Sequence, residues 1–252
     1  MLALTADDHP DLPGHLYSLA LHFDETYETL GDLKDLEAAL ENYRAAVDLT
    51  PKDHPDLPKR LQSLSTSFTD RYRRLGDLED LESALKNAQA AVNLIPEGHP
   101  AHPGSLHNLA VSFTDRYRRL GDLKDLEAAL QNQQSAVNLT PDHHKNFLGR
   151  QQALSASFKH RYRRLGDLQD LEMALNIDKA VVNLTPEGHQ ALPGRLHSLA
   201  VSLTDRYKRL GELKDLEATV ETMETAVKLT PEGHPDLPGR LQALAVTIRD
   251  RY

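Results

Sequence analysis

Histidine, arginine and aspartate are the side chains of this sequence that could do chemistry, and the histidines come first. Thirteen are present, and imidazole is the commonest metal ligand. The close pairs, His99 with His102 and His143 with His144, have no carboxylates at ligand spacing, and no His-Glu-x-x-His motif occurs. We therefore expect no metal and no cofactor. We interpret the histidine that recurs in Gly-His-Pro as a hydrogen-bonding residue of a turn.

Nucleophilic catalysis would need an activated nucleophile with an oriented base. The chain has no cysteine. Its serines and aspartates recur at one regular interval, which is typical of structural residues. There is no glycine-rich phosphate loop and no Gly-x-Ser-x-Gly motif. We predict that the chain is not an enzyme. The segment 143–148 is the one place where polar residues interrupt the regular pattern.

Arginine-rich stretches such as Asp-Arg-Tyr-Arg-Arg raise the question of phosphate or nucleic-acid binding. Within 115–127, however, four basic residues are balanced by four acidic ones, and the whole chain carries 29 Lys and Arg against 38 Asp and Glu, a net charge of −9. Net acidity disfavours nucleic acid. We expect the arginines to form ion pairs at helix ends and expect no nucleic-acid partner.

A membrane partner is not expected either, because no run approaches the ~18 apolar residues of a spanning helix. Residues 1–10 lack the basic start and apolar run of a secretory signal. The expected location is the cytoplasm.

These side chains recur because the sequence repeats every 45 residues. Residues 51–95 and 96–140 share 29 identical positions. Such a pattern predicts a linear array of one supersecondary unit. We expect one repeat domain over 1–252. Its units are expected at about 12–50, 57–95, 102–140, 147–185 and 192–230, with a final helix at 238–252.

One unit, 57–94, reads as two helices. Apolar residues from Leu61 to Leu75 follow a helical period and predict a first helix of about 18 residues. Gly76 is expected to end it in the left-handed conformation. Asp77 is a candidate N-cap for a second helix that ends near Leu94. The same order recurs along the chain, so we expect eleven helices and no strands.

The unit resembles a tetratricopeptide repeat (TPR). Leu16, Leu19-Ala20 and Phe23 fit the first helix of that pattern, Gly31-Asp32 fit its turn, and Ala39, Tyr43, Ala46 and Pro51 fit the second helix. The resemblance implies an all-α, right-handed superhelical solenoid of TPR-like hairpins. The ordinary unit has 34 residues. The 45-residue unit and its recurring sequence motifs are similar to the repeat arrays of fungal TPR proteins, which often accompany a caspase-like CHAT domain or an NTPase domain.

Two departures from the TPR pattern are visible. The aromatic residue of the second helix is Tyr43 in the first unit, but later units have other residues there. The loop at 143–148 loses Gly-His-Pro and is expected to be the least regular joint. The later residues at the aromatic position are Ala88, Gln133, Asp178 and Met223.

In TPR arrays the first helix of each unit lines a concave groove, and the resemblance carries this role to matching positions. They would offer amides and imidazoles, a small apolar row, an acidic row and a basic row, which suits an extended peptide. The expected groove residues are Gln62, Thr66, Thr69, Asp70, Arg73, His107, Val111, Thr114, Asp115, Arg118, Gln152, Lys159, His160, Arg163, His197, Thr204, Asp205 and Lys208.

The favoured function is thus a non-enzymatic protein-interaction scaffold whose partner is a protein or peptide. The alternative is an architectural or oligomerisation segment of a larger signalling or CHAT-protease-type protein. Residues 2–6 resemble the tail of a second helix, and the last helix offers Leu241, Leu244 and Ile248 without a following partner. We expect end-to-end self-association there, or contact with more of a longer protein.

Overall fold

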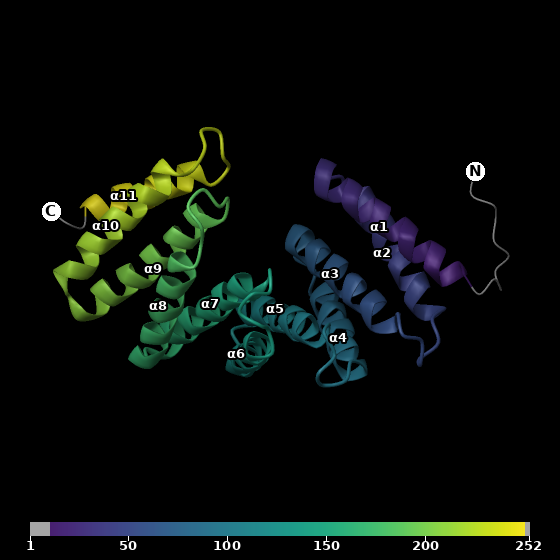
Figure 1. The fold of residues 1–252 in the computed structure, drawn as a ribbon. Helices are drawn as coiled ribbons and strands as arrows, with labels where there is room; N and C mark the ends of the chain where they lie inside the picture. The colour runs from purple at the N-terminus through teal and green to yellow at the C-terminus, as the bar shows by residue number, and fades with distance from the viewer. Residues whose placement is uncertain (1–10, 250–252) are drawn as a thin grey trace. The chain divides into compact units, whose positions relative to one another are not determined.

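The computed structural model describes residues 11–249, and it contains eleven α-helices and no strands over that range (Figure 1). The predicted helix at 238–252 is α11, of which residues 250–252 lie outside the described part, as does the expected helix tail at 2–6. The helices are α1 (Leu12–Leu30), α2 (Leu33–Asp48), α3 (Leu57–Leu75), α4 (Leu78–Leu94), α5 (His102–Leu120), α6 (Leu123–Asn138), α7 (Phe147–Leu165), α8 (Leu168–Asn183), α9 (Leu192–Leu210), α10 (Leu213–Lys228) and α11 (Leu237–Arg249).

The helices divide into two compact units, α1–α6 and α7–α11, with the boundary between Leu139 and Thr140. In the first unit, α1–α2, α3–α4 and α5–α6 form hairpins, and α2 packs on α3 as α4 packs on α5. In the second unit, α7–α8 and α9–α10 form hairpins, while α8 packs on α9 and α10 on α11. Each hairpin therefore contacts the next one inside its unit, as a repeat array requires.

The turn inside each hairpin is set by the Gly-Asp sequence. Gly76 has φ of 76°, in the left-handed region, and its N–H donates to the carbonyl of Tyr72. Asp77 then caps α4, because its carboxylate accepts from the Glu79 N–H. Both expectations from the sequence are confirmed. At the last such turn Glu212 replaces aspartate, and its side chain makes no cap hydrogen bond.

The loops between hairpins are held by histidine, as expected. His54 Nδ1 accepts from the Asp56 N–H at 3.1 Å, and the His54 N–H donates to the Pro51 carbonyl. His144 makes the same pair of contacts in the loop that lacks Gly-His-Pro. That joint therefore keeps the hydrogen bonding of the others. The histidines occupied in this way are His54, His99, His144, His189 and His234.

The core is built mainly from leucine and alanine. Leu36, Leu81, Leu126 and Leu171 of the second helices are fully buried. Phe68 is also buried, and an arginine guanidinium lies over its ring at 5.8 Å. This seam of small and medium side chains lets neighbouring helices approach closely, and it leaves the predicted groove residues on the flank of the first helices.

Candidate functional site

The expected groove residues lie on one flank of α3 and α5 in the first unit and on one flank of α7 and α9 in the second, but they differ in exposure. The hydrogen-bonding and apolar rows are mostly half-buried, and the basic row is exposed. Thr69, Asp115 and Lys159 are buried and offer almost no surface to a ligand. Half-buried are Gln62, Asp70, His107, Val111, Thr114, Gln152, His160, His197, Thr204 and Asp205, and exposed are Thr66, Arg73, Arg118, Arg163 and Lys208.

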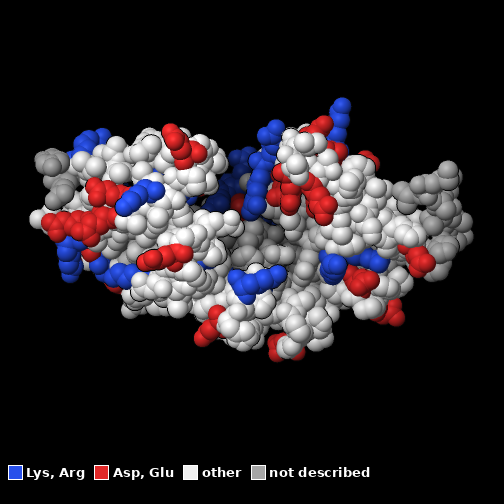
Figure 2. All heavy atoms as spheres, turned by 45° about the horizontal axis from the view of Figure 1, so that its top comes forward, with Lys and Arg blue, Asp and Glu red and all other residues white. Residues whose placement is uncertain are grey.

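The acidic and basic rows pair with each other across successive hairpins. Arg73 Nη2 lies 2.9 Å from Asp115 Oδ2, and Arg163 Nη2 lies 2.8 Å from Asp205 Oδ2. Arg73 also approaches Asp70 at 3.7 Å. On the face drawn in Figure 2, basic and acidic side chains lie next to each other in several places between uncharged residues. These charges hold neighbouring first helices together, so the rows are already partly satisfied within the chain.

Lys159 belongs to a buried polar cluster in the second unit. Its ammonium donates to Asp178 Oδ2 at 2.9 Å and to Ser198 Oγ at 2.7 Å. Asp178 also accepts from Ser155 and Ser202. Burial lowers the pKa of Lys159, and the Asp178 carboxylate opposes that shift. The cluster joins α7, α8 and α9.

Other units place different polar pairs at the corresponding position of the second helix. Tyr43 donates to Asp24 Oδ2 at 3.1 Å, and burial raises the pKa of Asp24. In the third hairpin, Gln133 contacts His107 Nδ1, with the donor depending on the histidine tautomer. Two of the departures from the aromatic pattern, Gln133 and Asp178, therefore make repeat-specific polar contacts, while the other two, Ala88 and Met223, are buried apolar side chains.

A second set of ion pairs closes the hairpins themselves. Arg71 binds Asp80 through Nε and Nη2, at 2.9 and 2.6 Å, and the carboxylate is almost fully buried. The hydrogen bonds to Asp80 raise the pKa of Arg71. The expected pairing of arginines at helix ends is confirmed. The same bidentate pairs are Arg116–Asp125, Arg161–Asp170 and Arg206–Asp215.

His197 predicts a pH dependence of stability. Burial, and then Arg240 and Lys159, lower the pKa of this imidazole below its usual 6.5. The unfolded chain therefore binds this proton more readily, so stability is lost as the pH falls below about 6.5. His197→Gln, which copies Gln62 and Gln152, should remove this loss. The free energy of unfolding, measured with urea between pH 7.5 and pH 5, should fall less in the variant than in the natural chain as the pH is lowered. Parallel curves would contradict the assignment.

The described residues hold no group of three or more histidines or carboxylates that could ligate a metal ion. In the same part of the chain, no helix is long and apolar enough to span a membrane. These two findings concern only the residues that the structure describes.

The comparisons with known proteins point to one repeat family. The tetratricopeptide repeat family matches residues 28–53, which cover the end of α1, the whole of α2 and the start of the next loop. The chain contains a tetratricopeptide repeat. No curated protein matches the sequence.

Solved structures show the same TPR fold. TPR-like repeats from Podosopora anserina have a TM-score of 0.61 at 16% identity, over 86% of this chain and 98% of that one. A thermophilic TPR protein of Thermus thermophilus has a TM-score of 0.59 at 19% identity, over 93% of this chain and 99% of that one. YrrB, a TPR protein with an unusual peptide-binding site, has a TM-score of 0.52 at 17% identity, over 89% of this chain and 91% of that one. The expected all-α helical-repeat solenoid is confirmed.

Proposed function

We propose that the chain is a non-enzymatic scaffold that binds an extended peptide or protein segment along the flank of its first helices. The observation that carries this proposal is a set of exposed or half-buried polar side chains on the same two helices as a small apolar side chain, within one compact unit. Gln62, Thr66, His107 and Thr114 accompany Val111 on α3 and α5. The TPR fold supports a protein partner, and the similar YrrB is described as having a peptide-binding site.

Burial narrows the binding surface. Thr69, Asp115 and Lys159 act in packing, and the Arg73–Asp115 pair links α3 to α5. Specificity would then come from the amides and imidazoles, which can address a peptide backbone, while the exposed arginines would add charge at the edge. The association of these repeats with a CHAT or NTPase domain in a longer protein stays a prediction.

The test adds bulk and charge to the flank without touching the ion pairs. A peptide is selected from a random library displayed on phage against the full chain, and its affinity is measured by calorimetry. Thr66→Arg with Val111→Arg should weaken binding at least tenfold, about 1.4 kcal/mol. The matched control, Gln89→Arg with Gln131→Arg, changes exposed residues of α4 and α6 and should leave affinity within twofold. Equal loss in both variants would contradict the proposal.

An architectural role is the second candidate, because several charged side chains of the acidic and basic rows already form ion pairs within the chain. In addition, Leu241, Val246 and Ile248 of α11 are exposed, at 47%, 40% and 37%. Light scattering at high protein concentration tests self-association. A strictly monomeric species would remove this candidate, and Leu241→Glu should abolish any dimer that forms.

A further inference from the structure

Most loops between hairpins are closed by a buried arginine that reaches back to a threonine. Arg195 Nη1 donates to Thr185 Oγ1 at 2.6 Å, and Arg240 Nη1 donates to Thr230 Oγ1 at 2.5 Å. Each of these arginines is at most 9% exposed. The same contact joins Arg60 to Thr50 and Arg150 to Thr140.

The loop between α4 and α5 lacks this contact. Ile95 stands where the other loops have threonine, and Ser105 stands where they have arginine. Ala101 replaces the aspartate that holds the guanidinium of Arg240 at 2.8 Å in the last loop. A cavity of about 610 Å³ lies beside this loop, within the first unit.

The cavity borders the place where the other loops seat an arginine side chain. In the last loop, Arg240 Nη2 lies 3.7 Å from where a Cβ on Gly194 would be. The residue that corresponds to Gly194 in the second hairpin is Lys59, which lines the cavity. Gln62 also lines it and donates a hydrogen bond to Ser105 Oγ. Lys59 and Gln62 therefore place the cavity beside the position that the guanidinium occupies in the last loop.

The part of the cavity wall that the loop after α4 contributes does not suit a cation. Ile95 and Ala101 offer no acceptor side chain, and Lys59 adds a positive charge at the wall that is glycine in the last complete hairpin. Lys59 Nζ already lies 5.2 Å from the centroid of the Tyr17 ring. Asp53 and Asp56 border the cavity from the loop before α3, where Lys52 accompanies them. The change specific to this joint therefore replaces acceptors by apolar surface and one ammonium.

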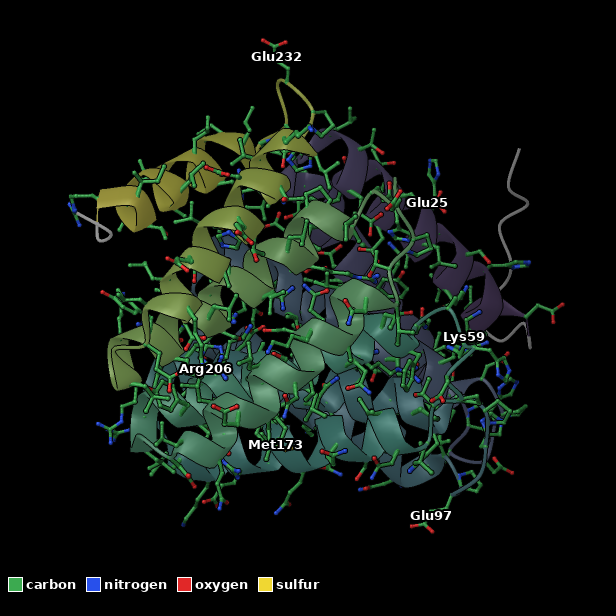
Figure 3. All side chains as sticks on the ribbon, turned by 60° about the vertical axis from the view of Figure 1, so that its left-hand side comes forward. Glu25, Lys59, Glu97, Met173, Arg206 and Glu232 are labelled. Atoms are coloured by element: carbon green, nitrogen blue, oxygen red, sulfur yellow. The ribbon has the colours of Figure 1, made fainter. Side chains whose placement is uncertain are left out.

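The remaining lining suits a flat ring with a polar edge. His54 and His99 accept backbone N–H groups at Nδ1, so the neutral imidazoles carry hydrogen on Nε2 and are donors there. Leu94 adds apolar surface. Figure 3 labels Lys59 and, in the loop after α4, Glu97, whose side chain points away from the ribbon. Proline rings in the wall are those of Pro55, Pro58 and Pro96.

We propose that this cavity binds the aromatic side chain of a partner polypeptide, placed next to a carboxylate of that partner. The ring packs on the proline and isoleucine walls, and a lysine ammonium above an aromatic face adds an electrostatic attraction. The carboxylate pairs with Lys59 and the Nε2–H donors. The volume falls within the usual size of ligand pockets. This site is separate from the flank of the first helices, although Gln62 borders both, and it does not require that flank to bind anything.

The test uses N-acetyl-L-tryptophan as the probe and the full chain as the protein. The chain has no tryptophan, so indole fluorescence reports the probe alone. Saturable binding with Kd of about 0.1–1 mM is expected for a ligand of this size. The double variant Ile95→Thr with Ser105→Arg copies the Thr185–Arg195 pair. That pair is a suitable template because its loop has alanine, Ala191, at the position of Ala101. This variant should bind at least tenfold more weakly, and its thermal midpoint should not fall.

Two further measurements keep the proposal falsifiable. In the natural chain, amide shifts caused by the probe should centre on His54, Lys59 and His99, and Lys59→Gly should weaken binding about fivefold. Tryptamine, which carries an ammonium in place of the carboxylate, should bind more weakly than the acid. Unchanged affinity in the double variant, shifts centred elsewhere, or tighter binding of tryptamine would overturn the proposal. Because the groove test uses other residues and a phage-selected peptide, either idea can fail alone.

Discussion

Asp178→Ala is expected to lower the free energy of unfolding by about 3–5 kcal/mol, the cost of stranding a buried charge. Lys159 is 6% exposed and Asp178 is 1% exposed, so water cannot replace the lost carboxylate. The pKa of Lys159 is already lowered by burial, and it should fall further without its partner. Urea unfolding followed by circular dichroism gives the loss, and hydrogen exchange should locate it in α7, α8 and α9.

The chain supplies its own control for this prediction. Lys159→Thr with Asp178→Ala reproduces Thr69 and Ala88, the pair at the same positions of the second hairpin. Removing both charges should restore most of the stability, to within about 1 kcal/mol of the natural chain. A double variant as unstable as the single one would show that the loss came from packing and not from the uncompensated ammonium.

The second large effect is expected at the turn between α9 and α10. Asp215→Ala should cost about 2–3 kcal/mol, because Arg206 loses two charge-assisted hydrogen bonds, of 2.8 and 2.5 Å. The loss is smaller than at Asp178 because Arg206 is partly exposed and keeps Glu172 at 3.4 Å. Thermal unfolding measures it.

A charge-conserving change separates geometry from electrostatics at this pair. Arg206→Lys keeps the positive charge but cannot form the two-pronged contact. It should therefore lose more than half as much stability as Asp215→Ala. If Arg206→Lys were neutral, the attraction would be a simple charge effect and the bidentate geometry would not matter.

The elements were predictable because local chemistry defines them. Gly76 and Asp77 mark a turn by their own conformational preferences, and the spacing of Leu61 to Leu75 marks a helix. Contacts between elements were not predictable in the same way. Arg71 and Asp80 meet only because two helices fold back at Gly76, so neither residue signals the other in the sequence.

The groove assignment shows a related limit. A helical wheel describes one helix and ignores the next hairpin, which covers part of its flank. Lys159 lies on that covered part, where Ser198 of α9 accepts from its ammonium. Thr69 is buried in the same way in the first unit. Thr66, by contrast, stays exposed on α3.

The polar pairs that differ between otherwise similar hairpins affect whether hairpins can pair in the wrong order. Hairpins so alike in sequence could exchange between chains or dock out of order, and the leucine seam alone would tolerate it. Asp24 with Tyr43, His107 with Gln133 and Lys159 with Asp178 do not interchange. A swapped hairpin would bury an ammonium or a carboxylate against the wrong neighbour. These pairs therefore discriminate against a shuffled order, although many other positions of the repeats are the same.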